Sequence, residues 1–305
     1  MWIAFIGIHL VSCTHLASAN ILNDSMPAGK NYDKALFRLW YPNGTKSIEG
    51  IIVLMPGSNS DGRDLVNDTA WQNLAKKYNF ALLGCYYTDK LHENMDIEEY
   101  ANAKEGSGQA LLSVLDKFAK KSGFHTLADV PLALWGHSAD GEFNYEFLCW
   151  RPDRVIVFIV NKGGFYYSAL APKQAREVPG IIFTGEIDLE VRKNILKGIF
   201  TMNRRAGALW SFAEEPNNGH SIGETKKLAT IFFDEVIPLR IIRKIENKKS
   251  DLPNPIRPDS GYAGDFKNDT LRQINEAQMN DILLSFIPTI KFGEASLKFI
   301  KNSPF

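Results

Sequence analysis

This 305-residue chain has few cysteines and no net charge. It contains three cysteines, and its 35 basic residues balance its 35 acidic residues. So few cysteines exclude a disulfide framework or a cysteine-rich metal cluster, and we expect Cys85 and Cys149 to be buried free thiols. A net charge of zero provides no overall field for nucleic acid or an anionic membrane. The chain also lacks a dinucleotide fingerprint and a phosphate-binding loop, so no cofactor is expected.

The chain also lacks an apolar run long enough to cross a membrane, which needs about 20 residues. Its N-terminal segment, residues 1–19, contains no Lys, Arg, Asp or Glu and ends in Ala17-Ser18-Ala19. This pattern predicts a cleaved export signal, and therefore a periplasmic or extracellular protein. Leu10-Val11-Ser12-Cys13 resembles a bacterial lipoprotein box, which would instead place a lipid anchor on Cys13. Because no basic residue precedes the apolar run, a cytosolic protein with an unusual first strand remains a third alternative.

Strand-like apolar runs alternate with amphipathic segments through most of the chain. The apolar fraction of 45% supports a full globular core. Strands are expected at 34–41 (an edge strand), 50–55, 80–86, 130–135, 155–160, 180–184 and 208–213, and helices at 69–77, 105–122, 141–150, 189–203 and 226–243. This alternation predicts an α/β fold with a mainly parallel central sheet and helices on both faces.

The amino-acid composition changes after the last of these predicted helices. Residues 247–269 are charged and rich in proline and glycine, whereas residues 275–300 return to helical spacing. We expect one α/β domain over residues 20–245, with 208–213 as its last strand. Residues 246–305 should form a helical extension packed on the core, because about 60 residues make only a marginal core alone.

The clearest functional signal is Gly136-His137-Ser138, between a predicted strand and a predicted helix. A sharp strand-to-helix turn would present the Ser138 hydroxyl at the carboxyl edge of the sheet, and it requires small neighbouring residues. The helix that follows would direct backbone N–H groups toward a developing oxyanion. Residues 132–141 therefore predict a nucleophilic serine.

Residues 50–239 resemble an α/β-hydrolase, with secreted feruloyl esterases and polyester depolymerases as the nearest members. The family's nucleophile elbow is Gly-x-Ser-x-Gly, but this chain has Asp140 at the fifth position, followed by Gly141. We expect the Asp140 side chain to crowd the elbow or to place a negative charge near the oxyanion, which would slow the reaction.

The resemblance also implies an acid and then a histidine after the serine in the chain. Asp188 matches the position of the acid best, and Glu186 and Glu190 are alternatives. His220, in a loop after the strand at 208–213, matches the position of the base. The base would take the proton from Ser138, and the acid would hold the base in one tautomer.

The loop after the strand at 50–55 should supply the second oxyanion donor. Gly57 permits a close backbone approach there, and we expect the Ser58 amide to act with the Ala139 amide. Tyr87 and Tyr166 follow two other strands and are candidates for substrate contacts.

These residues predict a serine hydrolase that cleaves carboxylic esters, small or polymeric, through an acyl-enzyme intermediate. Two alternatives remain open. One is a non-catalytic hydrolase-fold protein that binds a ligand in the same pocket. The other is a serine peptidase of the prolyl-oligopeptidase type.

Overall fold

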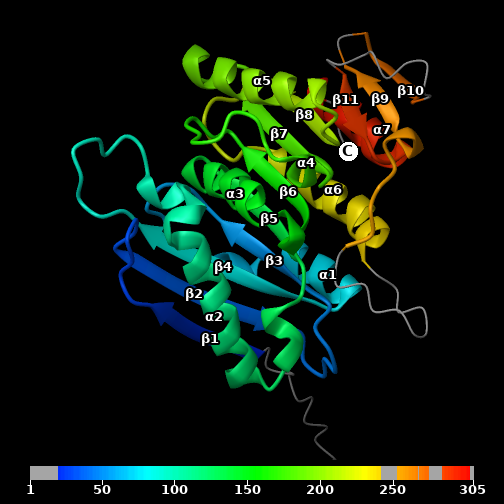
Figure 1. Ribbon diagram of the computed structural model, residues 1–305. Coiled ribbons are helices and arrows are strands. Elements are labelled where there is room, and N and C mark those ends of the chain that lie inside the picture. Colours follow the sequence, from blue (N-terminus) through cyan, green and yellow to red (C-terminus); the bar gives the residue numbers. More distant parts are fainter. Residues whose placement is uncertain (1–19, 242–252, 267, 275–283, 303–305) are drawn as a thin grey trace, which may run out of the picture.

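The computed structural model describes residues 20–241, 253–266, 268–274 and 284–302, and Figure 1 shows how their elements are arranged. Its largest element is an eight-stranded sheet with the order β1-β2-β4-β3-β5-β6-β7-β8. The strands are β1 (Asn20–Met26), β2 (Lys34–Tyr41), β3 (Gly50–Met55), β4 (Phe80–Thr88), β5 (Leu132–His137), β6 (Val155–Asn161), β7 (Gly180–Gly185) and β8 (Trp210–Glu215). From β4 to β8 every neighbouring pair is parallel, whereas β1 and β2 are antiparallel to their neighbours. The predicted mainly parallel sheet is confirmed.

Helices cover both faces of this sheet, because its central strands are apolar on both sides. The helices are α1 (Thr69–Tyr78), α2 (Ser107–Ser122), α3 (Ala139–Trp150), α4 (Lys173–Arg176), α5 (Glu190–Arg205), α6 (Thr225–Arg240) and α7 (Ile290–Ile300). Every residue of β3, β6 and β7 is buried. Residues of α2, α3 and α5 belong to one core cluster, and residues of α1, α6 and α7 belong to a second. Short 3₁₀ turns lie at Arg63–Asn67, Glu99–Ala101, Ala103–Glu105, His125–Ala128, Pro152–Arg154 and Pro258–Ser260.

The predicted position of β2 at the edge of the sheet is wrong. β1 pairs with β2 along its whole length, from Asn20 opposite Tyr41 to Met26 opposite Ala35. β1 carries polar residues such as Asn23 and Asp24, and its side chains are exposed or half-buried. A strand at the edge needs no continuous apolar run, so its sequence gave no strand signal.

The C-terminal part also differs from its prediction. It forms a small antiparallel sheet of β9 (Tyr262–Asp265), β10 (Thr270–Gln273) and β11 (Ser285–Ile287), followed by α7. The strand at 208–213 is therefore not the last one. Among the described residues of the helix expected over 275–300, residues 285–287 form a strand and residues 290–300 are helical. Phe286 and Ile287 are buried, and the Ser211 hydroxyl of β8 donates a hydrogen bond of 2.5 Å to the Phe286 carbonyl. Burial against β8 favours a strand over a longer helix.

Some predictions lie outside the described residues. These are the export signal at 1–19, the lipid anchor at Cys13 and the domain boundary at residue 245. Within the described ranges, no helix has the length and apolar character needed to span a membrane.

Candidate active site

Ser138 occupies a sharp turn between β5 and α3. Its backbone has φ 53° and ψ −130°, a region that is costly for any residue with a side chain. The turn is tight enough that a Cβ on Gly136 would lie 2.2 Å from the carbonyl oxygen of Asp140. The Ser138 amide donates to the Asn161 carbonyl at 2.8 Å, which fixes the turn to the end of β6. The Ser138 hydroxyl is therefore presented at the carboxyl edge of the sheet, as predicted.

The structure brings Ser138, His220 and Asp188 together in one hydrogen-bonded chain. Ser138 Oγ lies 2.8 Å from His220 Nε2, and His220 Nδ1 lies 3.1 Å from Asp188 Oδ2. Asp188 follows β7, and His220 lies in the loop after β8. A serine, a base and an orienting carboxylate in this order can activate the serine as a nucleophile.

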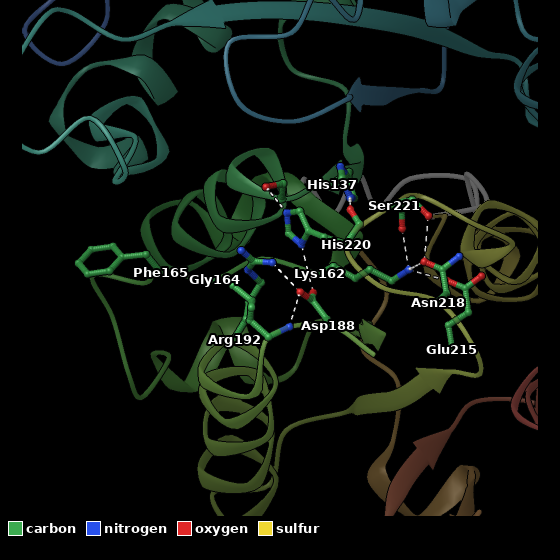
Figure 2. Close-up of polar contacts among 12 residues, drawn as sticks. His137, Lys162, Gly164, Phe165, Asp188, Arg192, Glu215, Asn218, His220 and Ser221 are labelled. Atoms are coloured by element: carbon green, nitrogen blue, oxygen red, sulfur yellow. Dashed lines mark hydrogen bonds and ion pairs between the residues drawn. The ribbon is translucent and has the colours of Figure 1, made fainter. Parts of the chain in front are cut away.

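Asp188 is held as a carboxylate from two sides. Its Oδ1 accepts a hydrogen bond from the Leu189 amide at 2.7 Å. It accepts another from Arg192 Nη1 at 2.6 Å (Figure 2). Burial by itself would raise the pKa of Asp188, but the hydrogen bonds from His220 and Leu189 and the charge of Arg192 outweigh it. The pKa of Asp188 therefore lies below its usual range. Neither Leu189 nor Arg192 was predicted to belong to the site.

The two alternative acids lie elsewhere. Glu186 accepts a hydrogen bond from the Asn217 amide at 2.7 Å. It therefore stabilises the loop that carries His220, but it does not bond to the histidine ring. Glu190 is exposed and forms an ion pair with Lys193 at 2.6 Å.

A buried lysine that sequence analysis missed fixes the loop around His220. Lys162 follows β6, has φ 57° and is fully buried. Its Nζ donates to Glu215 Oε2 at 2.5 Å, Asn218 Oδ1 at 2.9 Å and the Ser221 carbonyl at 2.6 Å (Figure 2). These acceptors lie on both sides of His220 in the chain. Its only sequence signal was a lysine directly after an apolar strand.

His137, the residue before the serine, links two loops of the site. Its Nε2 lies 2.8 Å from the carbonyl oxygen of His220, and its Nδ1 lies 3.1 Å from the carbonyl oxygen of Pro56. Burial lowers the pKa of His137 to about 4, although both carbonyls favour the protonated ring. The ring is therefore neutral at pH 7 and donates to one carbonyl at a time.

The amides of Ser58 and Ala139 are free to receive a ligand oxygen, since neither donates a hydrogen bond within the described part of the chain. Ala139 is the first residue of α3, where the helix dipole favours negative charge. Gly57 has φ +126°, a conformation that favours glycine, and a Cβ there would lie 3.5 Å from Ser138 Cβ. This glycine lets the Ser58 segment approach the elbow closely.

Asp140 does not occupy the position expected from the sequence. Its Oδ2 accepts a hydrogen bond from the Gly57 amide at 2.6 Å, and its Oδ1 accepts one from the Tyr100 hydroxyl at 3.0 Å. Burial raises the pKa of Asp140 to about 8, although both hydrogen bonds oppose the shift. The carboxyl group is therefore mostly neutral at pH 7, and it points to Gly57 and Tyr100. The expected negative charge at neutral pH and the expected crowding of Ser138 are both corrected.

A cavity of about 480 Å³ opens at Ser138. Its lining combines apolar, acidic and basic side chains with the predicted nucleophile: Ser58, Met95, Asp96, Ile97, Glu98, Ser138, Glu142, Gly164, Phe165, Val191 and Arg192. Glu142 Oε1 accepts hydrogen bonds from the amides of Gly164 (2.6 Å) and Phe165 (2.9 Å), which fixes this wall.

The architecture is similar to solved structures, whereas sequence comparison finds nothing. No protein-family model matches the chain, and no curated protein matches its sequence. A poly(3-hydroxybutyrate) depolymerase from Bordetella parapertussis has a similar structure, with a TM-score of 0.51 and 14% sequence identity, over 76% of this chain and 92% of that one. The chain has the α/β-hydrolase fold. A poly(aspartic acid) hydrolase from Sphingomonas sp. KT-1 gives a TM-score of 0.49 and 19% identity, over 70% of this chain and 97% of that one.

Neither predicted substrate-contacting tyrosine lines the cavity of this hydrolase fold. Tyr87 is buried in the core, and its hydroxyl donates to the Ser107 carbonyl at 2.8 Å. The ring of Tyr166 packs edge-on against Tyr145 with centroids 5.1 Å apart, and its hydroxyl is buried. Phe165, one residue earlier, lines the cavity instead. The prediction for this segment was therefore wrong by one residue.

The described part of the chain contains no group of three or more His, Cys, Asp or Glu residues able to hold a metal ion. Cys85 is buried and Cys149 is half-buried, and both are free. Burial raises the pKa of both thiols, which keeps them protonated and unreactive at neutral pH.

Proposed function

We propose that this protein is a serine hydrolase that cleaves carboxylic esters through an acyl-enzyme intermediate. The observation that carries the proposal is the hydrogen-bonded chain from Ser138 through His220 to Asp188, next to the free amides of Ser58 and Ala139. These groups supply a nucleophile, its base, an orienting carboxylate and two oxyanion donors.

In the acylation step, Ser138 Oγ attacks the ester carbonyl carbon while His220 Nε2 accepts the hydroxyl proton. Asp188 holds the ring and stabilises the imidazolium that forms. The amides of Ser58 and Ala139 donate to the oxyanion of the tetrahedral intermediate. The intermediate collapses, the carbon–oxygen bond to the alcohol breaks, and His220 returns the proton to that alcohol.

In the deacylation step, water takes the place of the alcohol. His220 Nε2 accepts a proton from the water as its oxygen attacks the acyl carbon. The second tetrahedral intermediate uses the same two amides. Its collapse breaks the bond to Ser138 Oγ, which recovers a proton from His220, and releases a carboxylic acid.

The placement of Asp140 supports catalysis over ligand binding alone. One argument for a non-catalytic protein is that Asp140 would crowd or repel the reaction centre; the other is the absence of the family's His-Gly sequence from the loop after the strand at 50–55. The Asp140 carboxyl instead contacts Gly57 and Tyr100, and burial raises its pKa to about 8. This arrangement leaves the Ser138 hydroxyl accessible from the cavity.

Esters are the proposed substrate class, either small molecules or accessible groups of a polymer. The cavity of about 480 Å³ has room for an acyl or aryl group against Met95, Ile97, Phe165 and Val191. Export of the protein is part of the proposal, and it rests on the sequence of residues 1–19.

A fluorophosphonate probe and p-nitrophenyl acetate test this function together. We expect wild-type protein to be labelled and to release p-nitrophenol, and Ser138→Ala to lose both activities without a change in Tm. Ser113→Ala, which alters a serine on the outer side of α2, is the matched control and should behave as wild type. Labelling of Ser138→Ala, or no labelling of folded wild type, would contradict the proposal. Faster cleavage of p-nitroanilides than of the corresponding esters would favour the peptidase alternative.

A further inference from the structure

The α3 helix carries three buried carboxyl side chains directly after Ser138. Asp140, Glu142 and Glu146 are 3%, 5% and 3% exposed. Asp140 accepts a hydrogen bond from the Gly57 amide in the loop after β3. Glu142 and Glu146 accept hydrogen bonds from backbone amides of the loop after β6: Gly164 and Phe165 for Glu142, and Tyr167 and Ser168 for Glu146. The helix therefore holds the loops around the cavity through its own side chains.

Asp140 is the member of this set that joins the two predicted oxyanion donors. It follows Ala139 in the chain, and it bonds to the amide of Gly57, the residue before Ser58. One side chain thus links the segment that carries the Ser58 amide to the helix turn that carries the Ala139 amide.

The carboxyl group of Asp140 is also fixed on its other side. Tyr100 is fully buried, and its hydroxyl donates to Asp140 Oδ1 at 3.0 Å. The Tyr100 ring stacks on Tyr87 with centroids 5.6 Å apart and planes 11° apart. A carboxyl held at both oxygens has one orientation, so the Gly57 amide is held in one position.

We propose that Asp140 is a positioning residue that sets the spacing between the Ser58 and Ala139 amides for oxyanion binding. The inference rests on the proposed ester hydrolysis and explains why this chain has aspartate where the family elbow has glycine. Oxyanion donors act only within a narrow range of distances, and a displacement of about 1 Å costs on the order of 10²-fold in rate. Loss of the link should therefore lower kcat more than it raises KM, because the ground-state ester depends less on these amides.

Two truncations and one isosteric change test this proposal with p-nitrophenyl acetate. Asp140→Gly, which restores the family elbow, and Asp140→Ala both remove the acceptor for the Gly57 amide. We expect either to lower kcat by about 10²-fold with KM within about twofold. Asp140→Asn keeps an oxygen acceptor for Gly57 and should keep kcat within about fivefold. Affinity for an alkyl boronic acid, which forms a tetrahedral adduct with the serine, should fall in parallel with kcat.

Glu146→Gln is the matched control, because Glu146 lies on the same helix and is as buried but holds residues that do not line the cavity. It should keep the wild-type kcat. Asp140→Gly with wild-type kcat, or Asp140→Asn as impaired as Asp140→Gly, would overturn the inference while the proposed function stands. Wild-type protein that neither hydrolyses the ester nor reacts with the fluorophosphonate would overturn the proposed function, and this inference with it.

Discussion

Lys162 Nζ lies 2.5 Å from Glu215 Oε2, and both side chains are buried next to the loop that carries His220. Because both side chains are buried, water does not stabilise the charge of either partner. Burial by itself would lower the pKa of Lys162, and Glu215 opposes that shift. The two charges therefore depend on each other, and the position of His220 depends on both.

Replacement of Lys162 by methionine should destabilise the protein and misplace His220. It leaves the Glu215 carboxylate buried without its cation, which costs about 3–5 kcal/mol in the free energy of unfolding. Urea unfolding at pH 7 and kcat for an ester measure the two effects. Lys173→Met, in the exposed pair of Lys173 and Glu177, is the control and should change stability by less than about 1 kcal/mol. Equal destabilisation by the two variants would contradict the prediction.

Arg192→Met should lower kcat by about tenfold. Arg192 Nη1 donates to Asp188 Oδ1 at 2.6 Å, a charge-assisted hydrogen bond that holds the acid toward His220. Loss of this hydrogen bond should raise the activation free energy by about 1.4 kcal/mol, which corresponds to a tenfold lower kcat. Arg205→Met is the matched control, since Arg205 is an exposed arginine at the other end of α5. Steady-state kinetics measure kcat for both variants. Equal kcat values would contradict a role of Arg192 in orienting Asp188.

Local sequence patterns were sufficient to predict the turn at Ser138 and most strands of the central sheet. The apolar run that becomes β5, followed by Gly136 and Ser138, predicted a turn that the structure contains. Asp188 and His220 followed from chain order within the resemblance, and the structure places them in one hydrogen-bonded chain with the serine. Parallel strands gather their following loops at one edge of the sheet, so residues far apart in sequence could be predicted to meet.

Side-chain partners across the fold could not be predicted in this way. Asp140 and Gly57 are 83 residues apart, and Lys162 and Glu215 are 53 apart. A polar residue after an apolar strand is typical of an exposed loop, so neither pair carries a local signal. The strands β9, β10 and β11 were missed because each has only three or four residues, too few for a clear alternation. They pair with one another, and β11 also contacts β8.

Phe292→Ala should destabilise the whole hydrolase fold and not a separate C-terminal unit. Phe292 of α7 is fully buried, and its ring centroid lies 4.7 Å from that of Phe232 on α6. Loss of this side chain from a core costs about 3–5 kcal/mol. We expect one cooperative unfolding transition by circular dichroism and by tryptophan fluorescence, shifted to lower urea concentration. Ile290→Ala, at a half-exposed position of the same helix, should shift it far less. Two separate transitions, with only one affected, would show that the C-terminal segment folds by itself.

Asp140→Asn should become more stable relative to wild type as the pH rises from 5 to 8. Burial raises the pKa of Asp140 to about 8 in the folded protein, whereas an aspartate in the unfolded chain titrates near 4. The folded state therefore retains a proton that the unfolded state releases between these values. The stability that this proton contributes is fully present below about pH 4 and is lost as the pH rises toward 8, by at most about 1.4 kcal/mol per pH unit. Asparagine does not titrate, so this loss is confined to the wild type.

Urea unfolding of both proteins at pH 5, 6, 7 and 8 measures this dependence as a difference in the free energy of unfolding. Burial also raises the pKa of Glu142, to about 7, and its charge contributes to the raised pKa of Asp140. Because Glu142 is present in both proteins, the difference reports the titration of Asp140 together with its interaction with Glu142. Glu190→Gln is the control: Lys193 holds the pKa of the exposed Glu190 below its usual range, so this carboxylate stays ionised in folded and unfolded chains alike above pH 6. Its difference from wild type should therefore be constant from pH 6 to 8. A difference for Asp140→Asn that is equally constant would mean that the Asp140 carboxyl is already ionised at pH 5, stabilised by the Gly57 amide and the Tyr100 hydroxyl.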